Sequence, residues 1–197
     1  MSSAEASTSP VQDQVLRAAA TILGQEPFVT VTLERVSATA RVSQEEVTAR
    51  FASMHHLGSA ILDHERASMR HIQERVADDD DPLEQIVHAF RLVGENLAKD
   101  IVVRAGVRIA QESRREFPER RLDPFRTWES FVDSQLRDAV RREMVRGDID
   151  IGKAVRLIVV AGMGTKELIA VRGNWTDAPE LLGNTATDML SLIVSLA

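Results

Sequence analysis

Hydrophobic residues recur every three or four positions along most of the chain, the spacing that is typical of amphipathic α-helices. No segment alternates apolar and polar residues between hairpin turn signals, which is the pattern expected of β-strands. The first apolar stripe ends at Gly24, a residue that commonly terminates a helix. The pattern therefore predicts an all-α protein. The first stripe consists of Val15, Leu16, Ala19, Ile22 and Leu23.

Two short helices are expected after the first one. Thr32 is placed to cap a helix near residues 33–39, and Ser43 with Glu46 forms a capping box for a helix near residues 43–50. A tight turn at residues 39–42 would join them. Two short helices and such a turn have the dimensions of a helix-turn-helix, although dimensions alone are a weak signal.

The remaining helices carry clearer start signals. A fourth helix is expected from near Ser53 to the acidic run at residues 78–81. Three later helices begin where an aspartate precedes a proline that is preset for a first helical turn. The last two long helices are expected at residues 151–171 and 179–196, the first with small residues in "AGMG" that let another helix come close. The three capped starts are Asp81-Pro82, Asp123-Pro124 and Asp177-Ala178-Pro179.

Composition places the chain among water-soluble globular proteins. Its 197 residues are 44% hydrophobic, and the absence of cysteine excludes disulfides and thiolate metal sites and fits a reducing cytoplasm. The first ten residues lack the basic and apolar regions of a signal peptide, so we expect a disordered tail there. Residues 154–171 include Arg156, Lys166 and Glu167, which favours a buried helix over a membrane span.

The sequence gives no sign of catalysis or of a bound metal. His55, His56, His64 and His71 have no carboxylate or cysteine at a recognised metal-binding spacing. Nucleophile elbows, phosphate-binding loops and the HExxH pattern are missing. We therefore expect neither enzyme activity nor a cofactor.

The segment "TVTLERVSATARVSQEEVTARFASMHHLGSAIL" resembles the N-terminal domain of the TetR family of bacterial repressors. The family's capping residues, aromatic anchor and leucine are matched here by Thr32, Ser43, Phe51, Ser53 and Leu57. In the body, "VVRAGVRIAQES", "DPFRTWESF" and "GDIDIGKAVRLIVVAGMGT" are similar to stretches of the γ-butyrolactone receptor branch, which controls antibiotic production and morphology in actinomycetes. The resemblance covers nearly the whole chain from about residue 11.

This resemblance implies a dimeric, ligand-responsive repressor of about nine helices. Residues 1–10 would form the tail, residues 11–56 the DNA-binding domain, and residues 57–197 the ligand-binding and dimerisation domain. The DNA-binding domain, which we call the head, would bind a palindromic operator. A small γ-butyrolactone- or furan-like molecule would release the head from the operator by moving the fourth helix. The last two helices would pair with those of a second subunit. The expected dimer contacts are Val160, Gly164, Leu182, Met189 and Ile193.

The resemblance also implies the effector site. The branch places its tryptophan in the ligand pocket, which assigns that role to Trp128, although packing alone also explains an aromatic residue on the apolar face of a helix. Thr165 would supply a polar group there, unless its hydroxyl bonds back to its own helix. The expected ligand contacts are Trp128, Phe131, Val132, Gln135, Phe90 and Thr165.

The DNA-binding segment departs from the family pattern. Arg41 stands in place of the turn glycine, and Gln44, Glu45 and Thr48 replace a lysine, a glycine and a tyrosine. A lysine that meets a phosphate is replaced by Met54, while Arg50 offers one phosphate contact. Operator affinity should therefore be below the family norm. The residues expected at the DNA are Thr32, Arg41, Ser43, Gln44, Glu45, Thr48, Arg50, Met54 and His55.

Charge supports the same expectation. The chain has a net charge of -6, which argues against indiscriminate nucleic-acid binding. Residues 11–60 contain four arginines against five acidic residues, so the head is itself slightly negative. Two hypotheses remain open: a repressor with weak DNA binding, in which Glu45 accepts a hydrogen bond from a cytosine, and a TetR-fold ligand-binding or partner protein that has lost DNA recognition and pairs with a related subunit.

Overall fold

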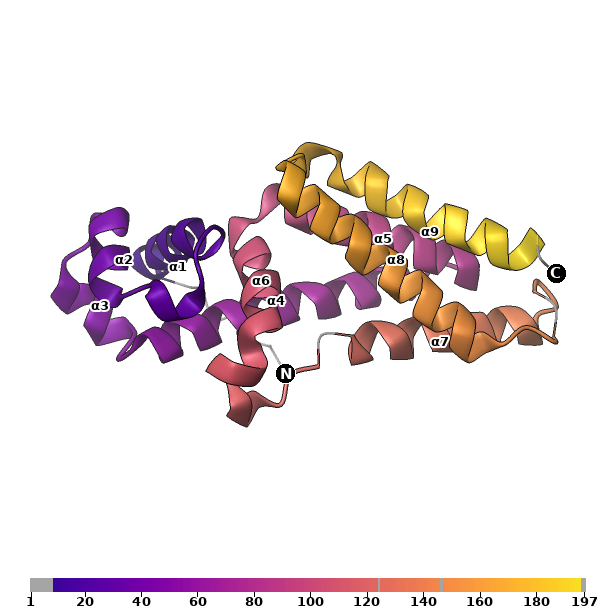
Figure 1. The fold of residues 1–197 in the computed structure, drawn as a ribbon, viewed down its shortest axis with the longest axis horizontal. Coiled ribbons are helices and arrows are strands. Elements are labelled where there is room, and N and C mark those ends of the chain that lie inside the picture. The colour runs from indigo at the N-terminus through magenta and orange to yellow at the C-terminus, as the bar shows by residue number, and fades with distance from the viewer. Residues whose placement is uncertain (1–8, 124, 146, 196–197) are drawn as a thin grey trace. The chain divides into compact units, whose positions relative to one another are not determined.

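The computed structural model describes residues 9–195 except 124 and 146. The described residues form nine α-helices and three short 3₁₀ helices without any strand, which confirms the all-α prediction (Figure 1). The α-helices are α1 Pro10–Leu23, α2 Leu33–Ala40, α3 Gln44–Arg50, α4 Met54–Val76, α5 Pro82–Lys99, α6 Ile101–Glu116, α7 Arg126–Arg141, α8 Ile151–Arg172 and α9 Ala178–Ser195. The 3₁₀ helices are η1 Phe28–Thr30, η2 Pro118–Arg120 and η3 Trp175–Asp177.

The chain divides into two compact units. Unit 1 contains the described part of residues 1–66 together with residues 101–122, and unit 2 contains residues 67–100 and the described part of residues 123–197. Helix α6 thus packs with the N-terminal helices, and α4 contributes residues to both units. The division by packing differs from the functional boundary expected at residue 56. That functional boundary stays a prediction.

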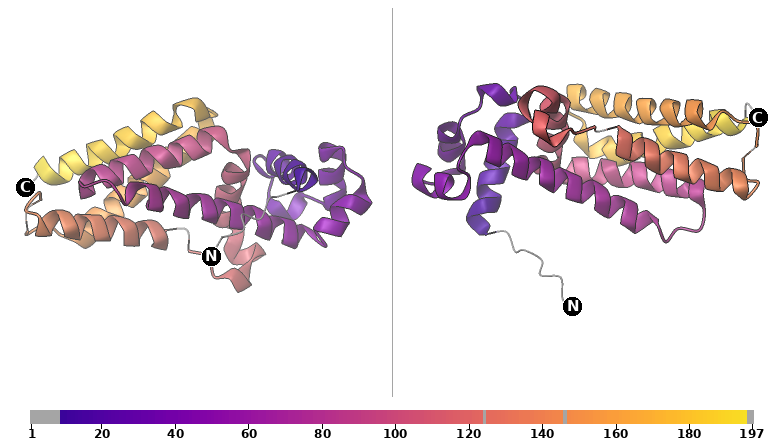
Figure 2. Two further views of the ribbon diagram at one scale, coloured as in Figure 1. Left: turned by 180° about the vertical axis from the view of Figure 1, so that it is seen from behind. Right: turned by 90° about the horizontal axis from the view of Figure 1, so that it is seen from below.

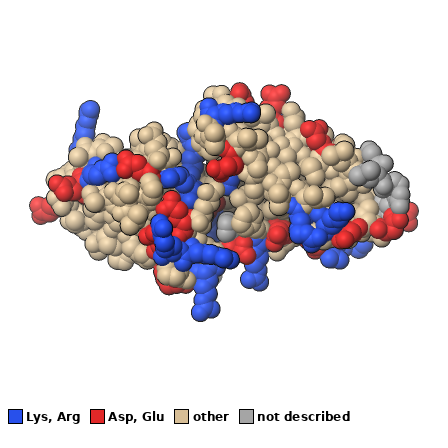
Figure 3. Space-filling view, in the orientation of Figure 1, with Lys and Arg blue, Asp and Glu red and all other residues tan. Residues whose placement is uncertain are grey.

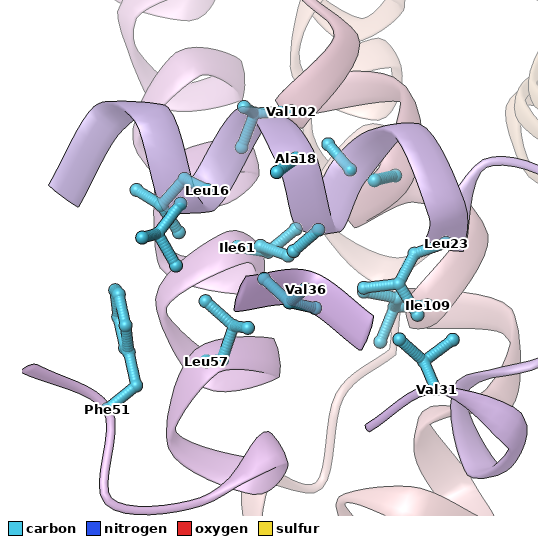
Figure 4. Packing of buried hydrophobic residues seen from close by; sticks show 14 of the residues in the cluster. Leu16, Ala18, Leu23, Val31, Val36, Phe51, Leu57, Ile61, Val102 and Ile109 are labelled. Atoms are coloured by element: carbon cyan, nitrogen blue, oxygen red, sulfur yellow. The ribbon is translucent and has the colours of Figure 1, made fainter. Parts of the chain in front are cut away.

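Unit 1 has one apolar core, to which α1, α2, α3, α4 and α6 all contribute (Figure 4). Each fully buried aliphatic side chain stabilises the fold by about 1.5–3 kcal/mol. Phe117, which follows α6, is also fully buried, and its ring centroid lies 4.9 Å from that of Phe28. The core side chains in Figure 4 include Leu16, Leu23, Val36, Phe51, Leu57, Ile61, Val102 and Ile109.

Polar contacts fasten α6 within unit 1. The Arg108 guanidinium donates to the carbonyl oxygens of Leu23, at 2.8 Å, and of Glu26. Glu112 accepts a hydrogen bond from the backbone N–H of Phe28 at 3.0 Å. These bonds satisfy backbone groups at the end of α1 and in the segment that follows it, and these groups would otherwise lose their hydrogen-bond partners on burial.

Unit 2 is a helical bundle in which α5 contacts α7 and α9, and α8 contacts α7 and α9 (Figures 1 and 2). The predicted cap of α5 is confirmed, because Asp81 accepts from the N–H groups of Leu83 and Glu84. Gly94 lets α5 approach the start of α9, since an added Cβ would lie 2.4 Å from the carbonyl oxygen of Ala178.

The other two predicted starts are shifted slightly. Asp123 accepts from the N–H groups of Phe125 and Arg126, but α7 begins only at Arg126, and residue 124 lies outside the described residues. Helix α9 begins at Ala178, directly after η3. None of the described helices is both long and apolar enough to cross a membrane.

Candidate functional site

Helices α2 and α3 form a helix-turn-helix whose turn spans residues 41–43. Arg41 ends α2 in the left-handed conformation, with φ 55° and ψ 39°. An arginine there costs about 1 kcal/mol more than a glycine. Ser37 holds the turn, because its hydroxyl donates to the carbonyl oxygen of Val42 at 2.7 Å and its own carbonyl accepts from the Val42 N–H at 3.2 Å. Sequence reasoning missed Ser37.

The predicted caps of both helices are confirmed. The Thr32 hydroxyl accepts from the backbone N–H of Arg35 at 3.3 Å, and the Ser43 hydroxyl accepts from the N–H of Glu46 at 3.2 Å. Ser43 also donates to the Glu46 carboxylate at 3.1 Å. In a standard capping box the glutamate carboxylate accepts a hydrogen bond from the backbone N–H of the capping residue. Here the Glu46 carboxylate accepts from the Ser43 hydroxyl instead. The Glu46 side chain is therefore bonded to the capping residue of α3.

Helix α3 presents a short polar face to solvent. Val47 is fully buried and anchors the helix, while Gln44, Glu45 and Thr48 are exposed. The Thr48 hydroxyl donates to the carbonyl oxygen of Gln44 at 2.9 Å, and Arg50 donates to the carbonyl oxygen of Glu46 at 2.9 Å. The exposed residues of α3 therefore include two carboxylates, those of Glu45 and Glu46, and one guanidinium, that of Arg50 at the far end.

The start of α4 adds little positive charge to this face. Met54 is half-buried against the core of unit 1, so it is a packing residue. The His55 imidazole lies 3.0 Å from the Glu119 carboxylate, and its ring centroid lies 4.7 Å from that of Phe117. Both residues that were expected at the DNA from α4 thus have partners within unit 1.

One arginine of the head, Arg35, is paired with an acid. Arg35 makes two hydrogen bonds to the Glu26 carboxylate, at 2.7 Å and 2.8 Å. The hydrogen bonds from Arg35 lower the pKa of Glu26, and the same bonds raise the pKa of Arg35. Arg35 is therefore occupied by a neighbour in its own unit.

Unit 2 contains an aromatic cluster formed by Phe90 of α5 with Trp128 and Phe131 of α7. The ring centroids of Phe90 and Trp128 are 6.2 Å apart, those of Trp128 and Phe131 are 5.9 Å apart, and both pairs meet edge to face. Gly162 of α8 lies against Phe90, because an added Cβ would be 2.4 Å from a ring carbon. Trp128 and Phe131 are half-buried, so the cluster keeps partial access to solvent.

The other residues expected at the ligand differ in position. Val132 is fully buried in the core, and Gln135 is half-buried on α7. The hydroxyls of Thr165 and Thr185 are 2.8 Å apart. Since Thr185 donates its proton to the carbonyl oxygen of Leu181, Thr165 is the donor in this pair. The Thr165 hydroxyl is thus bonded to α9.

Helices α8 and α9 expose apolar side chains. Along α8, Val160 has an exposed fraction of 65% and Val171 of 78%, and an added Cβ at Gly164 would meet no atom within 4 Å. Figure 3 shows few charged side chains over these two helices. Exposed apolar side chains that gather on two neighbouring helices are typical of a site of protein association. The exposed residues are Leu157, Val160, Leu168 and Val171 of α8 with Leu181 and Leu192 of α9, and we call this set the α8–α9 stripe.

The comparison with protein families decides the identity. The family model "Tetracyclin repressor-like, C-terminal domain" matches residues 82–194, which is more than half of the chain. The chain belongs to the TetR family. Members of this family are transcriptional regulators rather than enzymes.

Solved structures share the TetR fold at low sequence identity. A γ-butyrolactone receptor described as ArpA-like is 22% identical, covers 90% of this chain and 97% of its own, and has a TM-score of 0.74. The TetR family protein CprB from S. coelicolor A3(2) is 24% identical over 90% and 98%, with a TM-score of 0.71. SmeT, the repressor of the Stenotrophomonas maltophilia multidrug efflux pump SmeDEF, is 19% identical over 92% and 89%, with a TM-score of 0.70. A search of curated sequences found no significant match.

The structure of this TetR protein refines the residues expected at a dimer contact. Leu182 is only 3% exposed and packs within its own subunit, whereas Val160 and Gly164 are open. Met189 and Ile193 are half-buried. Sequence reasoning missed Leu157, Leu168 and Val171, although their spacing of three, four and seven from Val160 and Gly164 is a usable signal. Within the described ranges, no group of three or more histidine, aspartate or glutamate side chains is arranged to hold a metal ion.

Proposed function

We propose that this TetR-family protein is a repressor that binds a palindromic operator as a homodimer and is released by a small γ-butyrolactone- or furan-like effector. The observation that carries the proposal is the capped helix-turn-helix with α3 anchored by Val47 and its polar face exposed. Residues of this kind at the start of a recognition helix are placed to reach base edges in the major groove.

The residues we propose at the DNA are those of the exposed helix-turn-helix face. Gln44 is able to contact adenine, and Glu45 is able to accept a hydrogen bond from the amino group of cytosine. Arg41 and Arg50 are the exposed cations nearest to them along the chain. With so few phosphate partners, operator binding should be weak and its salt dependence shallow.

The effector site is proposed at the aromatic cluster. Ligand sites in proteins combine apolar and aromatic walls with a few polar groups, and Phe90, Trp128 and Phe131 supply such walls from two helices. The name of the γ-butyrolactone receptor with the same fold suggests the class of effector. A neutral molecule fits better than a charged one, because the cluster itself offers no ionic partner.

A gel shift on DNA that flanks the protein's own gene tests the proposal. At low salt, some palindromic duplex should bind above the non-specific background, and a γ-butyrolactone should release it. The salt slope should correspond to few phosphate contacts. If no duplex binds above background even at low salt, the repressor proposal fails.

Such a failure would favour the second candidate, a TetR-fold ligand-binding or partner protein that pairs with a related subunit. The Arg35–Glu26 pair and the exposed carboxylate of Glu45 favour this candidate, because both reduce the attraction of the head to a polyanion. Mixing with a related subunit would then give a heterodimer on size-exclusion chromatography.

A further inference from the structure

Gln73 is a polar residue on the inner face of α4. Met69, Ile72 and Val76 are buried in the part of α4 that belongs to unit 2. Gln73 follows Met69 by four residues and precedes Val76 by three, so it lies on the same side of the helix. Its Nε2 atom is buried and has no hydrogen-bond partner among the described residues. A buried donor without an acceptor is rare in native proteins and requires an explanation.

Gln73 lies at the level of the aromatic cluster. The Asn96 amide of α5 donates to the Ser68 hydroxyl of α4 at 2.6 Å, and the short segment 77–81 joins these two helices, which makes them antiparallel neighbours (Figure 2). Gln73 is five residues beyond Ser68, and Phe90 is six residues before Asn96. Each helix rises about 1.5 Å per residue, so Gln73 and Phe90 are nearly level along the two axes.

The other polar groups of this region are less suited to a ligand. The Thr165 hydroxyl already donates to Thr185. Gln135 is half-buried, and no atom of its side chain is both buried and without a partner in the described structure. Gln73 therefore has the strongest unmet requirement for an acceptor.

We propose that Gln73 orients the effector by donating a hydrogen bond from Nε2 to a carbonyl oxygen of the ligand, whose hydrocarbon part contacts Phe90, Trp128 and Phe131. This inference rests on the proposed ligand response and adds the group that recognises the ligand. An amide N–H donates only, so the bound atom must be an acceptor such as a lactone or ketone oxygen. The site would accordingly discriminate a carbonyl compound from a hydrocarbon of the same shape.

Two probes of matched shape test the inference: a γ-butyrolactone with an alkyl chain, and the cyclopentane with the same chain but no oxygen. Calorimetric titration would compare the full-length parent with Gln73→Met, which keeps the length of the side chain and removes the donor. Lactone affinity should fall about ten-fold in Gln73→Met, the size of one hydrogen bond to a buried donor. Cyclopentane affinity should stay the same or rise.

Two further variants serve as controls. Gln25→Met makes the same change at an exposed position in unit 1 and should leave both affinities unchanged. Gln135→Met tests the rival amide, and it should lose less lactone affinity than Gln73→Met. Thermal unfolding should find Gln73→Met at least as stable as the parent, because an unpartnered buried donor is replaced by an apolar group.

The outcomes separate this inference from the proposed function. If the parent binds the lactone and Gln73→Met binds it equally well, or loses both probes equally, the role of Gln73 is refuted while the ligand response stands. Loss of lactone affinity in Gln135→Met alone would likewise refute it. If the parent binds neither probe, both the inference and the proposed effector class are refuted.

Discussion

At the scale of single residues, the helix-turn-helix is well formed and electrostatically weak. Thr32 and Ser43 make the capping bonds that fix α2 and α3, and Val47 anchors the second helix. The exposed side of α3 nevertheless carries a carboxylate where a DNA-binding helix usually carries a lysine or an arginine. Met54 cannot simply be replaced by a lysine to repair this, because its side chain packs against the core of unit 1.

A double substitution on the exposed face of α3 should strengthen DNA binding. Gln44→Lys adds a phosphate partner, and Glu45→Gln removes a carboxylate without the helix-weakening effect of a glycine. The slope of log affinity against log salt should steepen by about one unit, as expected for one added phosphate contact. Fluorescence anisotropy over a salt series measures the slope.

The control for this experiment makes the same charge change far along the chain. Thr176→Lys with Glu180→Gln alters two exposed residues, one in η3 and one in the first turn of α9. If the two double variants change the slope equally, net charge rather than a contact at α3 explains the gain.

The Glu26–Arg35 pair predicts a pH dependence. Because the pKa of Glu26 is lowered in the folded protein, chiefly by its hydrogen bonds from Arg35, the pair stabilises the fold above the carboxyl's unfolded pKa. This stabilisation is lost as the pH falls through the folded pKa. In Arg35→Gln, the pKa of Glu26 should return to its ordinary value, as followed by NMR titration.

The same variant should be slightly less stable than the parent at pH 7, and the difference should shrink in acid. The effect should be small, since both side chains are well exposed to solvent. A stability difference between parent and variant that grows as the pH falls would show that the ionised pair does not stabilise the fold.

At the scale of helices, local chemistry was predictable and long-range packing was not. Helix starts could be predicted, because a cap needs only a side chain and the N–H groups two or three residues later. The starts predicted in this way are those capped by Thr32, Ser43 and Asp81. The place of α6 beside α1 rests on their shared apolar core and on Arg108, which reaches residues more than eighty positions away. No local pattern reveals either contact. Leu182 and Leu181 are adjacent leucines, and only the structure distinguishes the buried one from the exposed one.

The unpartnered amide of Gln73 could not have been predicted for the same reason. A glutamine next to Ile72 in a helix looks like an ordinary boundary residue in the sequence. Only the packing of α4 within unit 2 shows that its Nε2 atom is buried. All three residues of the aromatic cluster were among the expected ligand contacts. Trp128 and Phe131 share a helix face, whereas the contact of Phe90 with Trp128 joins α5 to α7 and follows from no local spacing.

Gly94 should be essential for the packing of α5 on α9. A Cβ in Gly94→Ala would lie 2.4–2.5 Å from backbone atoms of Ala178 and Pro179, which cannot rotate away. We expect a loss of about 1–3 kcal/mol in the free energy of unfolding, the usual cost of overpacking. Urea denaturation followed by circular dichroism measures it.

Gly183→Ala is the matched control on the facing helix. Its Cβ would meet the side chain of Arg91 at 3.3 Å, and that side chain is free to move. Alanine favours a helix over glycine by about 0.5–1 kcal/mol, so this variant should be neutral or more stable. Equal losses in the two variants would show that backbone crowding at Gly94 is not the cause.

At the scale of the whole molecule, the α8–α9 stripe predicts a dimer. Light scattering at micromolar concentration should give twice the 21.8 kDa chain mass. Val160→Glu with Leu168→Glu places two charges within the stripe, and burying them unpaired is costly, so the double variant should be a monomer.

Val29→Glu is the control for these substitutions, because Val29 is an exposed apolar residue in η1 of unit 1. This variant should remain a dimer. A monomeric parent would exclude the stripe as a subunit interface, and a double variant that stays dimeric would place the interface elsewhere.

The discontinuity of unit 1 limits how this protein can exchange parts with its relatives. Its core takes Val102, Ile109 and Phe117 from a stretch that follows α5 in the sequence, so a graft of residues 1–66 onto a relative's body would leave that core with foreign partners. Recombination between genes would therefore preserve a folded head in two cases only. Either residues 101–122 are transferred together with residues 1–66, or the relative supplies core side chains of matching volume. Changes of DNA specificity in this lineage should arise more readily by point substitution on α3 than by transfer of whole heads.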